Sequence, residues 1–188
     1  MSVVSLPERT RISADRYQKM VETGVLTQYD RVELIDGDML NMAPIGLNHS
    51  AVTDRLTKLL VLSAGDSAIV SPGRSLKLGE YSVPQPDLML LKLREDFYAA
   101  QIPVAPDVLL LVEVSESSLA YDQGIKRALY ARHGVVEYWV VDIPGQRVYV
   151  YLEPTGDGYA QALELAADDI VSARALPYFQ VAARKFFT

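Results

Sequence analysis

The chain has 188 residues, of which 49% are hydrophobic and 22% are charged, and its formal net charge is −6. This apolar content, with a moderate charge imbalance, excludes an intrinsically disordered protein. The absence of cysteine excludes disulfide frameworks, thiolate zinc sites and cysteine nucleophiles. The sequence shows no apolar run near the ~20 residues of a membrane-spanning helix and no signal-peptide core at its N-terminus. We therefore expect a soluble, cytoplasmic protein with no membrane partner.

The chain has more acidic than basic residues, and this excess affects which partners it can bind. A net negative charge repels polyanions at long range, which disfavours non-specific binding of nucleic acids. It does not exclude a site in which carboxylates hold a divalent cation that itself receives a phosphate group. Composition alone leaves both possibilities open.

The N-terminal third of the chain carries clear helix and hairpin signals. A helix is predicted from Ser13, a favourable N-cap, to about Thr23, with Gly24 as the residue that ends it. The runs 32–35 and 38–42 flank an Asp-Gly pair, which predicts a two-residue hairpin turn. This turn pairs residue 35 with 38 and 33 with 40. Apolar residues at helical spacing predict a second helix over 48–63.

The rest of the chain alternates short apolar runs with one long helical segment. Runs 88–91 and 108–114 are apolar on both faces, as strands inside a covered sheet are. The further predicted elements are short strands at 68–70 and 75–78, a helix over 119–133, a hairpin of 137–141 with 146–152, and strands within 159–188 beginning at 159–165. The pattern predicts one α/β domain over residues 1–188, with a mixed β-sheet flanked by helices.

Three carboxylates stand in apolar strand contexts. Glu113 lies inside a run that otherwise reads as fully buried, where an ionised carboxylate is costly unless a cation or strong donors compensate. Asp87 follows a proline at the start of an apolar strand, and Glu33 interrupts the first strand of the hairpin. Each has an ordinary structural explanation when taken alone. Together they resemble the oxygen ligands of a hard cation such as Mg²⁺.

A second Pro-Asp pair ends at Asp107 and competes with Asp87. Asp107 and Glu113 lie six residues apart on one strand, which separates them by about 20 Å at ~3.3 Å per residue. They cannot share a metal ion. Asp87 comes from a different strand, which can pair beside that of Glu113, so Asp87 is the better candidate.

A lysine is the remaining requirement of metal-assisted phosphodiester hydrolysis, because an ammonium can orient water and offset developing charge. Ser115, two residues after Glu113, stands where a lysine on the same strand face would be expected. The nearest downstream lysine is Lys126, on the predicted helix. Asp122 lies four residues before it, so an ordinary exposed ion pair is the competing interpretation.

Other kinds of site find little support. The chain has 2 histidines, His49 and His133, so a zinc site built on histidine spacing is not predicted. Neither common glycine-rich phosphate loop occurs. Trp139 is assigned to the core or to an interface rather than to base stacking.

From about residue 13 to 152 the chain resembles the Uma-type restriction endonuclease family, a branch of the PD-(D/E)XK nuclease superfamily. An ordered set of blocks carries the resemblance. They are Val32 to Gly37, Pro86-Asp87-Leu88, Val112 to Ser115, Tyr121 to Tyr130, and Gly134 to Asp142. The resemblance implies a restriction-endonuclease-like fold and a homodimer.

The resemblance also implies roles for individual residues. Asp87 and Glu113, with the backbone carbonyl of Val114, would hold the metal, and Glu33 would be an additional acid. In this branch the catalytic lysine comes from the following helix, which here means Lys126. The accessory residues implied are His49, Ser115 and Asp122, the last as a group that holds the lysine in place.

Three functions follow, from different classes. The first is a Mg²⁺-dependent endonuclease, with Mn²⁺ as a substitute ion, that hydrolyses DNA phosphodiester bonds. The second is an inactive protein that keeps the nuclease fold and serves as a binding or assembly module. The third is a metal-dependent phosphohydrolase that acts on nucleotides or RNA.

Overall fold

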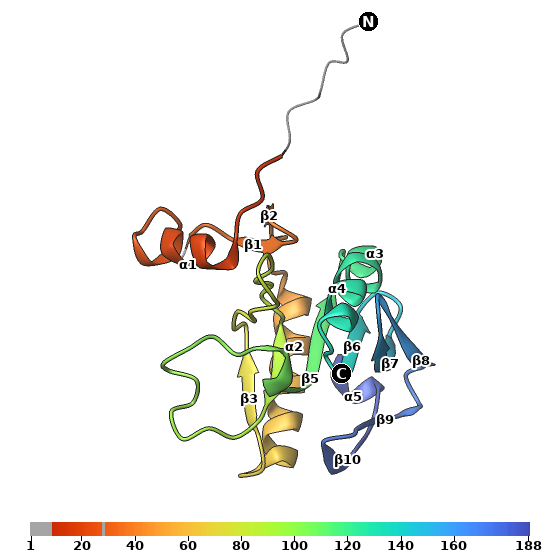
Figure 1. The fold of residues 1–188 in the computed structure, drawn as a ribbon. Coiled ribbons are helices and arrows are strands. Elements are labelled where there is room, and N and C mark those ends of the chain that lie inside the picture. The colour runs from red at the N-terminus through yellow and green to blue at the C-terminus, as the bar shows by residue number, and fades with distance from the viewer. Residues whose placement is uncertain (1–8, 28) are drawn as a thin grey trace, which may run out of the picture.

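A computed structural model describes residues 9–27 and 29–188 (Figure 1). Residues 1–8, where the sequence predicts no signal-peptide core, lie outside this description. The helical segments are α1 (Ala14–Glu22), α2 (Leu47–Ala64), a 3₁₀ turn η1 (Ala105–Asp107), α3 (Leu119–Tyr121), a π-helical turn η2 (Asp122–Lys126), α4 (Arg127–Arg132) and α5 (Arg184–Phe187). Within the described ranges, no helix combines the length and the apolar character that crossing a membrane requires.

In the part of the chain that the structure describes, ten strands form three sheets. They are β1 (Val32–Ile35), β2 (Asp38–Asn41), β3 (Ile69–Pro72), β4 (Leu88–Leu91), β5 (Val108–Ser115), β6 (Glu137–Asp142), β7 (Arg147–Thr155), β8 (Gly158–Leu165), β9 (Ile170–Ala173) and β10 (Leu176–Ala182). The main sheet has six strands in the order β3-β4-β5-β6-β7-β8, and two small sheets pair β1 with β2 and β9 with β10. In the main sheet β5 and β6 are parallel and every other neighbouring pair is antiparallel. The mixed sheet predicted from the sequence is confirmed.

The main sheet is covered on both faces, which explains why its central strands carry apolar residues at successive positions. Helix α2, the β9–β10 hairpin and α5 pack on one face, where Trp139 and Phe179 lie in contact (Figure 1). The segment α3-η2-α4 crosses the other face and connects the parallel strands β5 and β6, as a parallel pair requires. This crossover therefore brings helical side chains over the middle of the sheet.

Trp139 is fully buried in the core, as predicted. Its indole Nε1 donates to Oε1 of Glu137 at 2.9 Å, and the backbone N–H of Arg174 donates to the other oxygen of that carboxylate at 3.0 Å. Glu137 therefore joins β6 to the turn between β9 and β10. Because the indole is enclosed, it is not a surface on which a nucleic acid base stacks.

The local signals near the N-terminus are confirmed. Ser13 is the N-cap of α1, and its hydroxyl accepts a hydrogen bond from the backbone N–H of Arg16 at 3.2 Å. The hairpin turn has the expected register, with Ile35 opposite Asp38. Asp36 and Gly37 have φ values of 48° and 88°, the left-handed conformation that this turn requires and that a glycine adopts without strain.

One prediction for the later part of the chain is wrong. Residues 75–78 do not form a strand, because successive N–H groups donate to separate segments: that of Leu76 to Pro84 and that of Lys77 to Pro103. No continuous ladder can form under these conditions. The strands predicted within residues 159–188 form as β8, β9 and β10, and residues 184–187 then form α5, which buries Phe186 against the core.

Candidate active site

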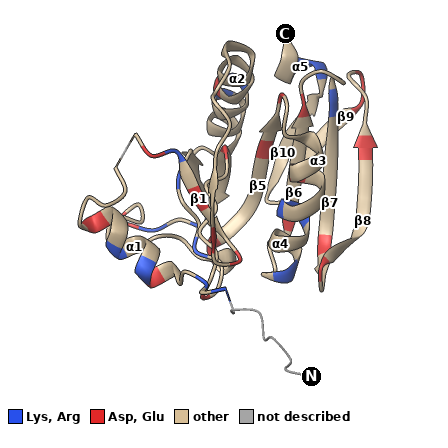
Figure 2. Ribbon diagram, turned by 90° about the horizontal axis from the view of Figure 1, so that it is seen from above, with Lys and Arg blue, Asp and Glu red and all other residues tan. Residues whose placement is uncertain are grey.

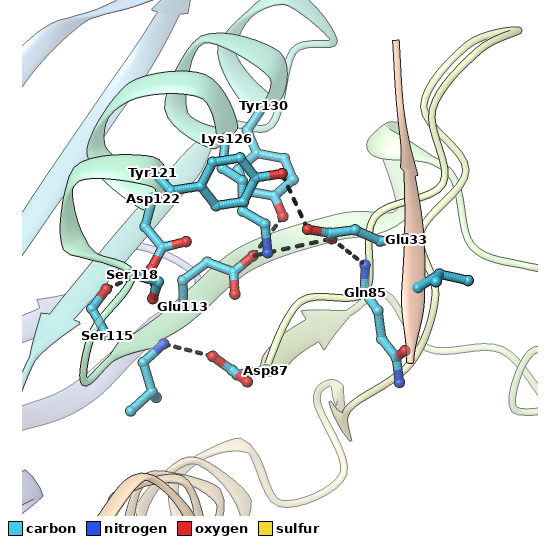
Figure 3. A network of polar contacts seen from close by, with 12 residues as sticks. Glu33, Gln85, Asp87, Glu113, Ser115, Ser118, Tyr121, Asp122, Lys126 and Tyr130 are labelled. Carbon is cyan, nitrogen blue, oxygen red and sulfur yellow. Dashed lines mark hydrogen bonds and ion pairs between the residues drawn. The ribbon is translucent and has the colours of Figure 1, made fainter. Parts of the chain in front are cut away.

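The central strands bring Asp87 and Glu113 together. Strands β4 and β5 are antiparallel, with Leu88 opposite Val112, and one further step in this register sets Asp87 opposite Glu113. Side chains at opposed positions on one face have Cβ atoms about 5 Å apart. The Asp87 carboxylate accepts a hydrogen bond from the backbone N–H of Val114 at 2.7 Å (Figure 3). Strand pairing therefore places both acids beside the N-terminal end of β4, as the sequence predicted.

Glu113 lies on the sheet face under the crossover and is only 3% exposed. Its Oε1 accepts hydrogen bonds from the Lys126 amine at 2.9 Å and from the Tyr130 hydroxyl at 2.6 Å. These two donors compensate the burial of a carboxylate in an apolar strand. Both hold the same oxygen, so the orientation of the Glu113 side chain is fixed by two independent groups.

Glu33 reaches the same place from the N-terminal hairpin. Its Oε2 lies 3.4 Å from the Lys126 amine, and its Oε1 accepts a hydrogen bond from the Tyr121 hydroxyl at 3.2 Å. The backbone N–H of Gln85 donates to Oε2 at 3.3 Å. Figure 3 shows the Lys126 amine between Glu33 and Glu113. One ammonium group thus bridges two buried carboxylates that are 80 positions apart in the sequence.

The crossover helix contains an irregular turn at the point where it meets the site. Residues 122–126 form a π-helical turn, and both Asp122 and Lys126 are buried there. Such turns occur mostly as single insertions in α-helices and are frequent at functional sites. Tyr130 follows Lys126 by four residues and so lies on the same helical face. The exposed Asp122–Lys126 pair considered from the sequence is therefore not formed.

Burial and charge act in opposite directions on the two partners of this ion pair. Burial lowers the pKa of Lys126, but the charges of Glu113 and Glu33 outweigh it, so the pKa of Lys126 is raised. Burial raises the pKa of Glu113 well above its usual value, opposed by Lys126 and reinforced by Asp87. The raised pKa favours the ammonium form of Lys126, in which the amine donates hydrogen bonds.

Asp122 does not hold Lys126 directly, contrary to the role inferred for it. Its Oδ2 accepts hydrogen bonds from the hydroxyls of Ser115 and Ser118, each at 2.6 Å. In the described part of the chain, its carboxylate makes no ion pair with the lysine amine. Ser115, on the same strand face as Glu113, therefore anchors the start of the crossover helix through Asp122, and the π-helical turn then directs Lys126 inward.

His49 lies beside Asp87, as the sequence suggested. Its Nε2 is 3.1 Å from Oδ1 of Asp87, and both side chains are largely buried. The hydrogen bond to Asp87 raises the pKa of His49 above its usual value, against the opposing effect of burial. The Nδ1 atom of His49 is buried with no hydrogen-bond partner among the described residues.

A titration of the two histidines tests this arrangement. In the metal-free protein we expect His49 to titrate above the usual pKa of about 6.5 and His133, whose pKa burial lowers, to titrate below it. Imidazole signals in two-dimensional NMR report both values, and a His133→Gln variant assigns them. The His49–Asp87 pair then contributes its full stability below pH ~6.5 and loses it as the pH rises through the raised pKa of His49. An Asp87→Asn variant that leaves the titration of His49 unchanged would contradict the contact.

The four residues assigned as catalytic from the sequence line one pocket of about 300 Å³. The pocket is lined by Arg31, Glu33, Asn41, Met42, Ala43, Pro44, Ile45, His49, Gln85, Asp87, Glu113, Val114, Glu116, Ser117, Ser118, Tyr121, Asp122 and Lys126. Asp107 lies elsewhere, since its carboxylate accepts a hydrogen bond from the backbone N–H of Val104 at the turn before β5. The choice of Asp87 over Asp107 therefore agrees with the geometry.

The donor set of this pocket fits a hard divalent cation. Asp87 and Glu113 offer carboxylate oxygens at adjacent positions of paired strands, and the two charges disfavour each other without a counter-ion. The carbonyl of Val114 points to the same side of β5 as its N–H, which faces Asp87. In residues 9–27 and 29–188, no three acidic or histidine side chains are grouped closely enough to hold a metal. The set is thus two carboxylates and one carbonyl, which leaves positions for the water that Mg²⁺ retains.

Three contributors to this site were not predicted from the sequence. They are the hydroxyls of Tyr121 and Tyr130 and the backbone N–H of Gln85. The sequence contains one indication of Tyr130: it follows Lys126 at helical spacing, so its hydroxyl is expected on the same helix face as the lysine amine. The sequence contains no indication of the N–H of Gln85, since any non-proline residue offers the same group.

The mixed sheet, with a helical crossover between its two parallel strands, defines a restriction-endonuclease-like fold. A crystal structure of a "putative nuclease belonging to DUF820" from Anabaena variabilis ATCC 29413 has this fold, with a TM-score of 0.74 and 16% identity over 94% of this chain and 97% of that one. The chain belongs to the Uma2 family, described as "Putative restriction endonuclease", whose model matches residues 14–184. A search of curated proteins found no match. Family membership supports a nuclease function and extends the sequence resemblance through β8, β9 and β10.

Proposed function

We propose that the protein is a Mg²⁺-dependent endonuclease that hydrolyses DNA phosphodiester bonds, with Mn²⁺ as a substitute ion. One observation carries the proposal: a buried lysine amine lies between two buried glutamates in the pocket that Asp87 also lines. Burial of a lysine amine costs free energy, and in this pocket the ion pairs with Glu33 and Glu113 offset that cost. Membership of a nuclease family supplies the reaction class.

In this proposal the acids and the lysine have separate roles. Asp87, Glu113 and the Val114 carbonyl would hold the metal, and Glu33 would keep the Lys126 amine in place. The metal, when bound, would polarise the phosphate and lower the pKa of an attacking water. Lys126, as an ammonium paired with Glu33 and Glu113, would orient that water by donating a hydrogen bond and would offset negative charge on the phosphate as the bond breaks.

The hydroxyl of Tyr130 would act through Glu113. It occupies Oε1 together with Lys126, and no described donor is bonded to Oε2. The second oxygen of Glu113 is therefore the one available for a cation. Two such sites facing a duplex would suit cleavage of both strands, and we propose a homodimer as the assembly that provides them.

Plasmid cleavage in the presence of Mg²⁺ or Mn²⁺ tests the proposal. We expect the wild-type protein to nick or linearise supercoiled DNA, and we expect chelation by EDTA to stop the reaction. The double variant Asp87→Ala, Glu113→Ala should lose the activity, because both carboxylate ligands are removed. Equal cleavage by wild type and double variant would contradict the assignment. Absence of both cleavage and divalent-ion binding in the wild type would instead favour the inactive binding or assembly module.

A further inference from the structure

The pocket carries more acidic than basic side chains, although its proposed substrate is an anion. The carboxylates that line it are Glu33, Asp87, Glu113, Glu116 and Asp122. Of the lysine and arginine residues that the structure describes, only Lys126 and Arg31 line it. Figure 2 shows basic and acidic positions interspersed along the ribbon, and the net charge of the chain is −6. Attraction of a phosphodiester therefore depends on the few cations at the site.

The two basic residues are used differently. Lys126 is only 5% exposed and is bound on both sides by Glu113 and Glu33. Arg31 is exposed, and its guanidinium makes no ion pair with any residue in the described ranges. Arg31 is thus a pocket cation whose hydrogen-bond donors are not committed to a carboxylate.

The backbone places Arg31 on one face of the β1–β2 hairpin. Its carbonyl accepts a hydrogen bond from the N–H of Met42 at 2.8 Å, which extends the β1–β2 ladder by one step beyond Val32 and Asn41. In an extended strand, residues two apart lie on the same face. Arg31 therefore shares a face with Glu33, whose carboxylate enters the site.

We propose that the guanidinium of Arg31 binds the two non-bridging oxygens of a phosphate in the nucleic acid strand that enters the pocket. This inference rests on the proposed nuclease function and adds a substrate-binding residue to it. A guanidinium suits this role because its planar fork of donors matches two phosphate oxygens and remains charged at every relevant pH. Arg31 contacts the substrate rather than the metal, so it acts mainly on substrate affinity.

Steady-state kinetics of DNA cleavage with Mg²⁺ or Mn²⁺ test the inference, using the full chain. We expect Arg31→Ala to raise KM by roughly tenfold to a hundredfold, the range for one hydrogen bond to a charged group, with little change in kcat. Arg31→Lys should give an intermediate KM, because it keeps the charge but loses the fork. Arg16→Ala is the matched control. The substitution removes the same charge, and Arg16 is exposed on α1 and does not line the pocket.

A second readout separates this inference from the proposed function. Binding of a fluorescein-labelled oligonucleotide is measured by anisotropy in Ca²⁺ over a range of salt concentrations. Arg31→Ala should weaken binding and reduce the salt slope by about one phosphate contact, while Mn²⁺ affinity measured calorimetrically stays at the wild-type value. If the wild type binds the oligonucleotide through Arg31 but never cuts it, the nuclease proposal fails and the phosphate contact stands. If Arg31→Ala matches Arg16→Ala in KM, affinity and salt slope, or the wild type does not bind, the inference is overturned.

Discussion

Replacement of Lys126 with methionine is expected to abolish DNA cleavage and to lower the free energy of unfolding by about 3–5 kcal/mol. The reason is the same for both effects. Methionine has a similar volume but no charge, so it leaves two buried carboxylates, those of Glu33 and Glu113, without their shared cation. Breaking a buried ion pair by removing one partner is strongly destabilising, because the remaining charge is neither solvated nor paired.

Chemical denaturation in the absence of metal measures the loss of stability, and plasmid cleavage measures the loss of activity. The matched control is Lys58→Met, because Lys58 is exposed on α2 outside the pocket. We further expect Mg²⁺ to raise the melting temperature of Lys126→Met more than that of the wild type, since a bound cation offsets the same negative charge. A Lys126→Met protein as stable and as active as the control would show that the amine neither stabilises the buried carboxylates of Glu33 and Glu113 nor takes part in cleavage.

Replacement of Glu113 with glutamine is expected to weaken metal binding strongly while changing the free energy of unfolding little. The amide keeps the shape of the side chain and an oxygen that can accept hydrogen bonds from Tyr130 and Lys126. It also removes an ionised group that burial disfavours, as the raised pKa of Glu113 indicates. We therefore expect the free energy of unfolding to stay within about 1 kcal/mol of the wild-type value, while affinity for Mn²⁺ falls by at least about 100-fold.

Isothermal titration with Mn²⁺ and plasmid cleavage measure these effects, and Glu95→Gln is the control because Glu95 is exposed and outside the pocket. Comparison with Lys126→Met makes the test specific. Both variants should lose cleavage, but only the lysine variant should lose substantial stability. Undiminished Mn²⁺ binding by Glu113→Gln would remove Glu113 from the proposed ligand set.

The parts of the fold that were predicted from the sequence are those governed by local chemistry. The Asp36-Gly37 turn needs two left-handed residues, and few pairs other than Asp-Gly provide them, so both the turn and its register follow from the sequence. The apolar runs of β4 and β5 predicted buried strands for a similar reason. Residues 75–78 were assigned wrongly because their hydrogen-bond partners come from distant segments, which no local pattern records.

The site residues likewise differ in whether a local sequence pattern indicates them. Asp87 and Glu113 were found because a carboxylate in a buried strand is out of place and therefore visible in the sequence. The position of Lys126 came from family resemblance, since on spacing alone it matched an exposed ion pair with Asp122. The π-helical turn buries both residues, and the hydroxyls of Ser115 and Ser118 donate hydrogen bonds to Asp122 at its start. Such a turn follows from tertiary contacts and leaves no periodic signal.

We propose that Asp87 and Glu113 form a cation site with the Lys126 amine close beside it. Anomalous diffraction from crystals soaked in Mn²⁺ would locate the bound cation. We predict one strong peak in contact with oxygens of Asp87, Glu113 and the Val114 carbonyl, and no such peak in crystals of Glu113→Gln. A peak bound by other residues, or none at an ion concentration that supports cleavage, would contradict the claim.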